Sequence, residues 1–224
     1  MHVPGDLIAS GRDADIYEYD KFSVLRRSRS GRSQAHEVDA MVFAHASGYP
    51  VPHVMEMSDD GVDVVMEKIE GPTMIEAIAS RPWRLTSFAR DLAQLHDSLH
   101  LLAAPGSLPA APCSPGDRFL HLDLHPLNVI LSKRGPVVID WANAARGDPL
   151  VDVALTWALL ASADVPSGRL QAAMTSVGRS VFARAFLRTI STPGVSSVLS
   201  CVVEWKCQDD HMSAAEISRM RALL

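Results

Sequence analysis

The chain has few cysteines and few aromatic residues. The three cysteines in its 224 residues are Cys113, Cys201 and Cys207. Their number is odd and no CxxC spacing occurs, so the sequence argues against a disulfide framework and suits a reducing compartment. Aromatic residues make up 6% of the chain. With so few of them, the tryptophans are better assigned to core packing than to a cage for a quaternary ammonium group. Those considered are Trp141, Trp157 and Trp205.

Long apolar runs and an excess of positive charge are also absent. The longest apolar stretch, around residues 153–161, is too short to span a bilayer, and the amino terminus lacks the basic and apolar regions of a signal peptide. The formal net charge is −5, with no long basic stretch that would indicate nucleic-acid binding. We therefore expect a cytoplasmic protein with no membrane and no nucleic-acid partner. No feature of the sequence indicates an oligomeric state.

The most informative segment is His121-Leu-Asp-Leu-His-Pro-Leu-Asn128, followed by Val137-Val-Ile-Asp-Trp141. In phosphoryl transfer one Asp orients the attacking hydroxyl group, while an Asn and a second Asp hold magnesium. The spacing of the two carboxylates and the carboxamide fits this chemistry. Asp123 is therefore the candidate catalytic residue, and Asn128 and Asp140 are the candidate magnesium ligands.

Three other interpretations compete for these residues. His121, Asp123 and His125 have the composition of a metal cluster, although a cluster leaves Asn128 and the downstream Asp unexplained. Alternatively, the polar residues belong to an ordinary loop, with His121 hydrogen-bonded in the core. The third interpretation is a kinase-shaped binding or regulatory protein without catalytic activity.

Residues 119–131, together with residues 137–143 and 147–152, resemble the aminoglycoside phosphotransferase family, which includes choline-kinase-like and other small-molecule kinases. The usual family pattern is His-Gly-Asp-Leu-His-Pro-Gly-Asn. This chain has Leu122 and Leu127 at the two glycine positions, so its loop is bulkier and less suited to positive φ. Every polar residue of the pattern is present.

The resemblance implies an α+β, two-lobed protein-kinase-like fold with a small antiparallel-sheet N-lobe and a mainly helical C-lobe. Residues 1–70 would form the nucleotide-binding lobe, and residues 71–224 the helical lobe with the catalytic loop and the acceptor site. The implied activity is transfer of the γ-phosphate of ATP or GTP, with Mg²⁺, to a hydroxyl group of a small molecule such as an aminoglycoside-like compound.

The amino-terminal third contains candidates for the nucleotide-binding elements. Residues 7–11, 15–19 and 22–26 predict three strands, with one glycine where the wider superfamily has three. In the resemblance Arg26 takes the place of the lysine that contacts the nucleotide phosphates. A planar guanidinium group is not equivalent to an ammonium group, and a solvated basic run is the alternative.

Residues 33–45 have apolar positions at helical spacing, and Glu37 matches the glutamate that pairs with the basic residue in the family. Its alternative role is that of an acid in the first turn of a helix. Residues 61–71 predict a strand that runs into a Gly-Pro break and resembles the hinge that binds the nucleotide base. The hinge residues taken as candidates are Met66, Glu67 and Ile69.

The carboxyl-terminal part predicts helices at residues 73–80, 85–96 and, approximately, 167–190, 194–207 and 212–224, with a mobile loop at 103–116. Asp148 and Pro149 predict a helix start, and Asp152 matches a family position that we interpret as a scaffold. Three acidic residues near the carboxyl terminus, Glu204, Asp209 and Asp210, could offer negative charge to a cationic acceptor. Acidic residues near a helix end are more often simply solvated.

Overall fold

The computed structural model describes residues 4–11, 13–162, 169–209 and 212–224. The chain forms two compact units. Unit 1 contains Met1–Pro72 and Val129–Ala144, and unit 2 contains Thr73–Asn128 and Ala145–Leu224. Unit 1 is built mainly of strands and unit 2 mainly of helices, which confirms the predicted α+β class. The predicted boundary at residue 70 lies near the end of the first segment, but that prediction counted residues 129–144 with the helical lobe.

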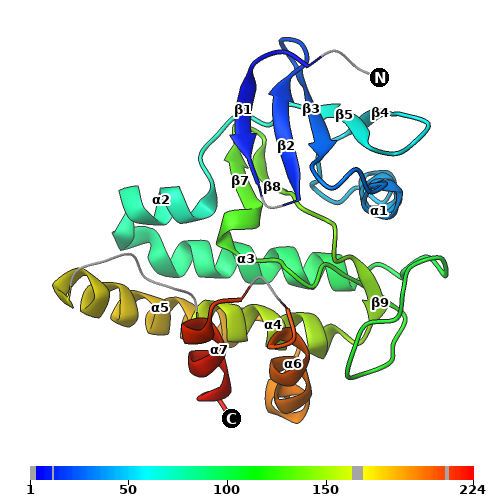
Figure 1. Cartoon of the computed structure of the whole chain (residues 1–224). Helices are drawn as coiled ribbons and strands as arrows, with labels where there is room; N and C mark the ends of the chain where they lie inside the picture. The colour runs from blue at the N-terminus through cyan, green and yellow to red at the C-terminus, as the bar shows by residue number, and fades with distance from the viewer. Residues whose placement is uncertain (1–3, 12, 163–168, 210–211) are drawn as a thin grey trace. The chain divides into compact units, whose positions relative to one another are not determined.

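Unit 1 contains a five-stranded antiparallel sheet with the strand order β1-β2-β3-β5-β4 (Figure 1). Its strands are β1 (Leu7–Ser10), β2 (Ala14–Glu18), β3 (Ser23–Ser28), β4 (Val54–Met57) and β5 (Asp63–Glu67). In the centre of the sheet Leu25 pairs with Val65, and Val24 pairs with Met66. All four side chains are buried, so the β-branched and apolar residues of β3 and β5 stabilise the middle of the sheet.

Helix α1 (Ala35–Ala46) and the hairpin of β7 (Val129–Ser132) and β8 (Gly135–Val138) complete unit 1. The N–H of Leu131 donates to Pro72 O at 2.8 Å, and the N–H of Val138 donates to Pro50 O at 2.8 Å. Gly71 has φ +148°, and a Cβ atom there would overlap with the backbone carbonyl of Leu131. The hairpin therefore packs against the end of the β5 segment so closely that glycine is required.

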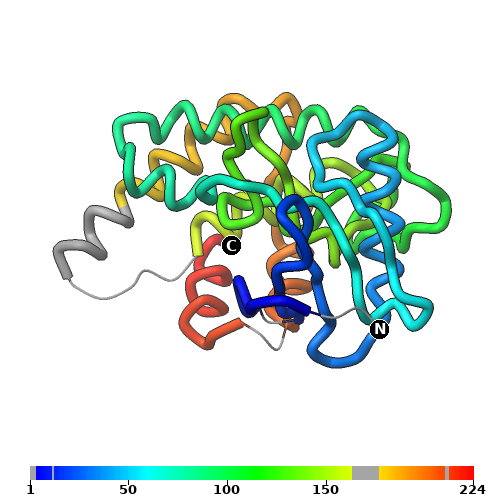
Figure 2. Tube along the Cα trace, turned by 90° about the horizontal axis from the view of Figure 1, so that it is seen from above, coloured from blue at the N-terminus to red at the C-terminus, as the bar shows by residue number. Residues whose placement is uncertain are grey.

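Unit 2 is built around the buried helix α4. Its helices are α2 (Met74–Ser80), η1 (Pro82–Arg84), α3 (Leu85–His100), η2 (Pro126–Asn128), α4 (Pro149–Ser162), α5 (Arg169–Thr189), η3 (Val195–Ser197), α6 (Leu199–Lys206) and α7 (Ala214–Arg221). Helix α4 is buried on nearly all sides and contacts α5, α6 and α7, while α3 lies alongside α5 (Figures 1 and 2). A helix that is apolar all round is typical of the centre of a domain.

Local signals set the ends of these helices. Thr73 and Glu76 form a capping box at the start of α2, since the side chain of each accepts the backbone N–H of the other. At the start of α4, Asp148 Oδ1 accepts the N–H of Leu150 at 2.9 Å, and Pro149 occupies the first helical position. The predicted start of α4 is therefore confirmed. The predicted helix at 167–190 corresponds to α5, with residues 167 and 168 outside the described part of the chain.

The segment before the candidate catalytic loop is anchored by backbone hydrogen bonds. Strand β6 (Arg118–Leu120) pairs with β9 (Ala145–Gly147), and isolated bridges join Ala103 to Arg118 and Ala110 to Arg146. Residues 103–116 contain no helix or strand, as predicted. Their backbone nevertheless makes hydrogen bonds to residues of β9.

Cys113 and Cys201 form a disulfide bond with a Cα–Cα distance of 5.6 Å. The sequence argument against a disulfide framework was wrong for these two, and Cys207 is unpaired among the described cysteines. The partners lie 88 residues apart in the sequence. Their proximity depends on long-range packing within unit 2, which cysteine spacing does not reveal.

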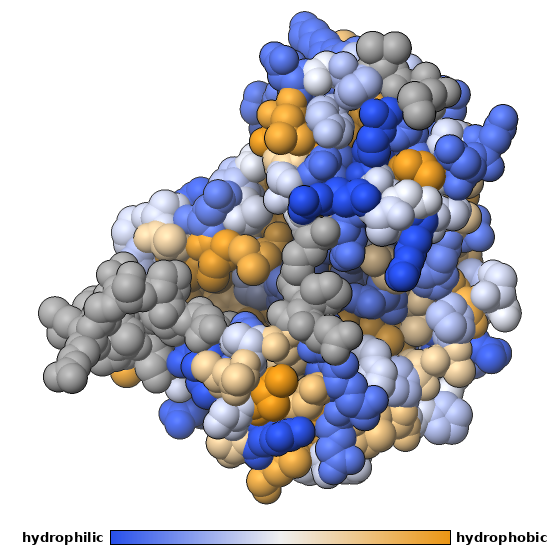
Figure 3. All heavy atoms as spheres, viewed as in Figure 1, coloured by the Kyte–Doolittle hydropathy of each residue, from blue (hydrophilic) through white to orange (hydrophobic). Residues whose placement is uncertain are grey.

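On the face shown in Figure 3, hydrophobic residues are scattered among hydrophilic ones. Such scattering is usual for protein surfaces. Within the ranges that the structure describes, no helix is both long and apolar enough to cross a membrane.

Candidate functional site

The segment that contains the candidate catalytic residue Asp123 follows β6 in unit 2 and is held by a buried carboxylate. Asp152, on α4, has no exposed surface, and its Oδ2 and Oδ1 accept the backbone N–H groups of His121 at 3.1 Å and Leu122 at 2.9 Å. Although burial raises its pKa, the hydrogen bond from His100 and the charges of nearby histidines hold the pKa of Asp152 well below its usual range. Asp152 thus acts as an ionised scaffold for the loop.

Leu122 adopts the left-handed conformation that the family pattern reserves for glycine. Its φ is +57°, whereas Leu127, at the second glycine position, does not have a positive φ. The side chain of Leu122 is buried and belongs to a cluster with Leu120 and Leu155. The left-handed backbone is therefore formed with a bulkier residue than glycine. The hydrogen bond from the Leu122 N–H to Asp152 and the apolar packing of its side chain offset the conformational cost.

Asp123 lies next to Leu122, and its carboxylate has two side-chain neighbours. Asn128 Nδ2 donates to Asp123 Oδ2 at 3.2 Å and to its backbone oxygen at 3.0 Å, and His125 Nε2 lies 3.5 Å from Oδ1. Burial raises the pKa of Asp123, but the hydrogen bond from His125 and the charges of His125 and Lys206 outweigh it, so the pKa is lowered. Asp123 is thus ionised at neutral pH, with 16% of its side chain exposed.

His125 has a defined orientation. The N–H of Leu127 donates to His125 Nδ1 at 3.3 Å, so Nδ1 accepts and Nε2 carries the proton of a neutral ring. That proton faces the carboxylate of Asp123. The alternative metal cluster with His121 does not form, since in the described ranges the three residues whose ligand atoms converge are His96, His100 and Asp152.

In unit 1 the candidate phosphate-binding arginine is brought together with its expected partner. Arg26 Nη1, on β3, donates to Glu37 Oε2 on α1 and also to Gln34 Oε1. Arg26 Nη2 lies 3.7 Å from Asp140 Oδ1. Sequence reasoning identified Arg26, Glu37 and Asp140 but missed Gln34, whose polar side chain just before α1 was the available signal.

Glu37 and Asp140 have different environments. The pKa of Glu37 is raised to about 7, because burial and the Asp140 charge raise it by more than the Arg26 charge lowers it. Asp140 lies two residues after β8, has φ +65°, and has 47% of its side chain exposed. An exposed carboxylate in a left-handed turn is suited to binding a hard cation.

The candidate hinge residues Met66 and Glu67 end β5, and Ile69 lies two residues after it. Met66 is buried, and the N–H of Glu67 donates to His53 O at 2.8 Å. The carboxylate of Glu67 pairs with Arg134 at 2.7 Å. Ile69 is half-buried, and no hydrogen bond of its N–H group occurs within the described ranges. Of the three hinge candidates, Ile69 has an amide group left for a ligand.

The carboxyl-terminal acidic residues are only partly available. Glu204 is exposed, whereas Asp209 pairs with Lys206 at 2.8 Å. Asp210 lies outside the described residues. Trp141 is fully buried, and its ring packs edge-on against Tyr49 at 5.6 Å.

The sequence was compared with models of known protein families and with curated proteins. Residues 100–188, which include Asp123, Asn128 and Asp140, match the sequence model of the phosphotransferase enzyme family. No curated protein sequence matches the chain.

Several solved structures share the fold. The aminoglycoside phosphotransferase APH(2'')-Ib, bound to ADP, is similar with a TM-score of 0.63 and 14% identity over 96% of this chain and 90% of that chain. APH(2'')-IIa with streptomycin and ATP has a TM-score of 0.64 and 16% identity, with coverages of 98% and 91%. A choline/ethanolamine kinase family protein from Mesorhizobium loti has a TM-score of 0.57 and 16% identity, with coverages of 98% and 88%. These matches confirm the predicted family resemblance and the protein-kinase-like fold.

Proposed function

We propose that the chain, which shares its catalytic-loop segment with the phosphotransferase enzyme family, transfers the γ-phosphate of ATP or GTP to a hydroxyl group of a small molecule. The observation that carries this proposal is the ionised carboxylate of Asp123, oriented by Asn128 and His125 in a loop that Asp152 holds. We assign the nucleotide to the amino-terminal lobe, residues 1–70, and the acceptor to the helical lobe, residues 71–224.

In this proposal Asp123 orients the acceptor hydroxyl and accepts its proton. The ionised state of Asp123 supports this role, because a protonated carboxyl group cannot receive the proton. The His125 Nε2–H and the Asn128 amide fix the direction in which the carboxylate points. Phosphoryl transfer depends mainly on such positioning and on neutralising the phosphate charge.

We assign magnesium to Asn128 and Asp140, whose oxygen donors fit this ion. Asn128 uses its Nδ2 group for Asp123, which leaves its amide oxygen to coordinate a cation. Asp140 offers a largely exposed carboxylate. Oxygen ligands of this kind suit Mg²⁺, which when bound would neutralise the negative charge of the triphosphate.

Nucleotide binding is assigned to Arg26 and the hinge. The guanidinium group of Arg26, held by Glu37 and Gln34, is placed to bind phosphate oxygens. The Ile69 amide and the surroundings of Met66 and Glu67 would bind the base. Two of the similar solved structures contain streptomycin or gentamicin, so an aminoglycoside-like compound is the acceptor class to test first.

One observation favours the rival function of an inactive, kinase-shaped binding protein. Arg26 lies 3.7 Å from Asp140, so a fixed positive charge accompanies a proposed magnesium ligand. If Arg26 replaced the cation there, nucleotide binding would not depend on magnesium.

Calorimetry with ATP and GTP, each with and without magnesium, separates the two functions. Magnesium-dependent binding supports the kinase, and turnover is then measured with a panel of aminoglycosides and other hydroxylated amines. Asp123→Asn should abolish turnover and spare nucleotide binding, whereas Asp140→Asn should weaken magnesium-nucleotide binding. Full turnover by the Asp123 variant would exclude the assigned role.

We also propose the cytoplasm as the location, where both nucleotides are available. The Cys113–Cys201 bond is of a kind more typical of oxidising compartments. Trapping the thiols with an alkylating agent during cell lysis tests the location, since reduced cysteines are expected in the cytoplasm.

A further inference from the structure

The backbone carbonyl of Leu124, directly after Asp123, is held by two buried side chains from different helices. Thr156 Oγ1, on α4, donates to Leu124 O at 2.9 Å. His96 Nε2, on α3, lies 3.3 Å from the same oxygen and 3.1 Å from Thr156 Oγ1. His96 is 0% exposed and Thr156 is 1% exposed. Neither residue belongs to the catalytic motif.

These contacts define where the proton of His96 lies. The single hydroxyl proton of Thr156 points to Leu124 O, so a proton on Nε2 is the arrangement that lets His96 donate to the same oxygen, while His96 Nδ1 lies 3.7 Å from Asp152 Oδ2. Burial lowers the pKa of His96 to about 4, so the ring is neutral and Nδ1 is unprotonated at neutral pH. His96 is therefore a fixed, uncharged donor to the loop backbone.

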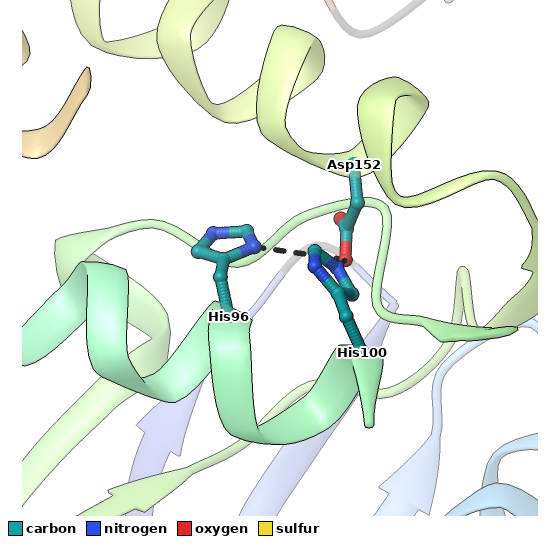
Figure 4. A group of neighbouring side chains, drawn as sticks. All are labelled: His96, His100 and Asp152. Atoms are coloured by element: carbon teal, nitrogen blue, oxygen red, sulfur yellow. Dashed lines mark hydrogen bonds and ion pairs between the residues drawn. The ribbon is translucent and has the colours of Figure 1, made fainter. Parts of the chain in front are cut away.

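Figure 4 shows that His96 and His100, from one helix, point toward Asp152. This trio has the composition of a zinc site. However, His100 Nε2 already bonds to Asp152 Oδ2 at 3.0 Å, and both carboxylate oxygens accept backbone N–H groups. In the described ranges the cluster has three ligands, whereas closed structural zinc sites have four. Its contacts are better explained by the loop that it holds.

We propose that His96 and Thr156 are positioning residues that set the orientation of Asp123 through the carbonyl group of Leu124. This inference rests on the proposed kinase function. Asp152 holds the two amides before Asp123, and His96 with Thr156 holds the carbonyl after it. Asp123 is thus fixed on both sides by groups inside unit 2. Small displacements of a catalytic group reduce the rate strongly, so these remote contacts matter for turnover.

The test uses the full-length protein with three variants and a matched control. Thr156→Val removes the hydroxyl group and keeps the shape, and His96→Leu removes the ring donor. His96→Gln keeps an N–H donor at similar reach. Ser162→Ala is the control, because Ser162 is a buried hydroxyl residue of the same helix that bonds only within it through its side chain, to Ala158 O.

With an acceptor that the wild type phosphorylates, Thr156→Val and His96→Leu should lower kcat about tenfold and change both KM values less than about twofold. His96→Gln should recover to within about threefold of the wild type, and Ser162→Ala should be unchanged. A purely structural role would instead lower the melting temperature of Thr156→Val and His96→Leu in parallel with kcat, with no recovery of kcat in His96→Gln at unchanged stability. Unchanged kcat in both Thr156→Val and His96→Leu would overturn the proposal.

A second measurement does not depend on activity and separates failure of this inference from failure of the kinase function. Hydrogen exchange at the amides of residues 121–125 should accelerate at least about tenfold in Thr156→Val, with exchange elsewhere in unit 2 unchanged. The nitrogen chemical shifts of His96 should show a proton on Nε2. Unaltered exchange at these amides, or stoichiometric zinc that is lost in His96→Leu, would overturn the positioning role even in a protein that turns over.

Discussion

Reduction of the Cys113–Cys201 bond is expected to destabilise unit 2 by several kcal/mol. The bond joins residues 88 apart, so it closes a long loop that contains the catalytic segment. The chain-entropy relation for a loop of this size gives about 4.6 kcal/mol at room temperature, and native disulfides typically contribute about 2–5 kcal/mol. We expect a loss of about 3–5 kcal/mol, which corresponds to a fall in Tm of about 6–20 °C. Both cysteines are exposed, so a reductant reaches them in the folded state.

Urea unfolding with and without a phosphine reductant measures this loss. Tryptophan fluorescence reports on both units, because Trp157 and Trp205 are half-buried in unit 2 and Trp141 is buried in unit 1, so the measurement uses a Trp141→Phe background to follow unit 2. The slope of the unfolding free energy against urea should be smaller for the oxidised protein, since its cross-linked unfolded chain exposes less surface. The double variant Cys113→Ser with Cys201→Ser should match the reduced protein.

Cys207→Ser is the control and should leave the midpoint unchanged, since Cys207 is unpaired. A change below about 1 kcal/mol on reduction would refute the reasoning from loop closure. The absence of a cross-linked peptide in a non-reducing digest would show that the bond itself does not form.

Three further predictions concern single substitutions. Leu122→Gly relieves the strain of a left-handed backbone, about 1–2 kcal/mol, but removes a buried side chain that contributes about 3–5 kcal/mol. Urea unfolding should therefore show a net loss of about 2–3 kcal/mol in the free energy of unfolding. Leu127 is exposed, so Leu127→Gly should lower the free energy of unfolding by less than about 1 kcal/mol. Gly71→Ala would overlap with the β7 backbone at a positive φ and should lower the stability of unit 1 by about 2–4 kcal/mol; Gly106→Ala, with open space around it, is the control, and equal effects would contradict the argument. Because burial raises the pKa of Glu37 to about 7, the folded state binds a proton more tightly than the unfolded state, so the stability of unit 1 should fall by up to about 3 kcal/mol as the pH rises from about 5 to about 8. Glu37→Gln should flatten this dependence in unfolding measured across that range, and an unchanged slope would contradict the assigned pKa.

The contacts within the candidate catalytic loop could be predicted from the sequence because its residues are close together in the chain. Asp123 and Asn128 are five residues apart, and their contact depends on one short turn. The pairing of Arg26 with Glu37 was also predicted, since the family resemblance supplied a partner on the following helix. Leu122 has a left-handed φ at a position where the family sequence pattern has glycine.

Contacts between distant segments were beyond the local pattern. The side chains that bind Leu124 O come from two helices. The position of a buried His or Thr within an apolar helix does not indicate which distant residue it will contact. The same holds for the disulfide bond between Cys113 and Cys201, because an odd number of cysteines does not indicate which of them pair. Assignment of residues 129–144 to unit 1 required knowing that the hairpin packs beside Pro72 rather than beside the helices that flank it in sequence.

The division of the chain has a consequence for its synthesis on the ribosome. Unit 1 takes its last segment, Val129–Ala144, only after residues 73–128 have been made, and unit 2 is completed by the residues that follow. Domains commonly fold as they emerge, amino-terminal first. Here the five-stranded sheet is synthesised before residue 73, but unit 1 is complete only when β7 and β8 have been made, so the nascent chain exposes the surface that the hairpin later covers. The helical segment is inserted between two parts of one sheet unit, and no single cleavage of the chain separates two complete units.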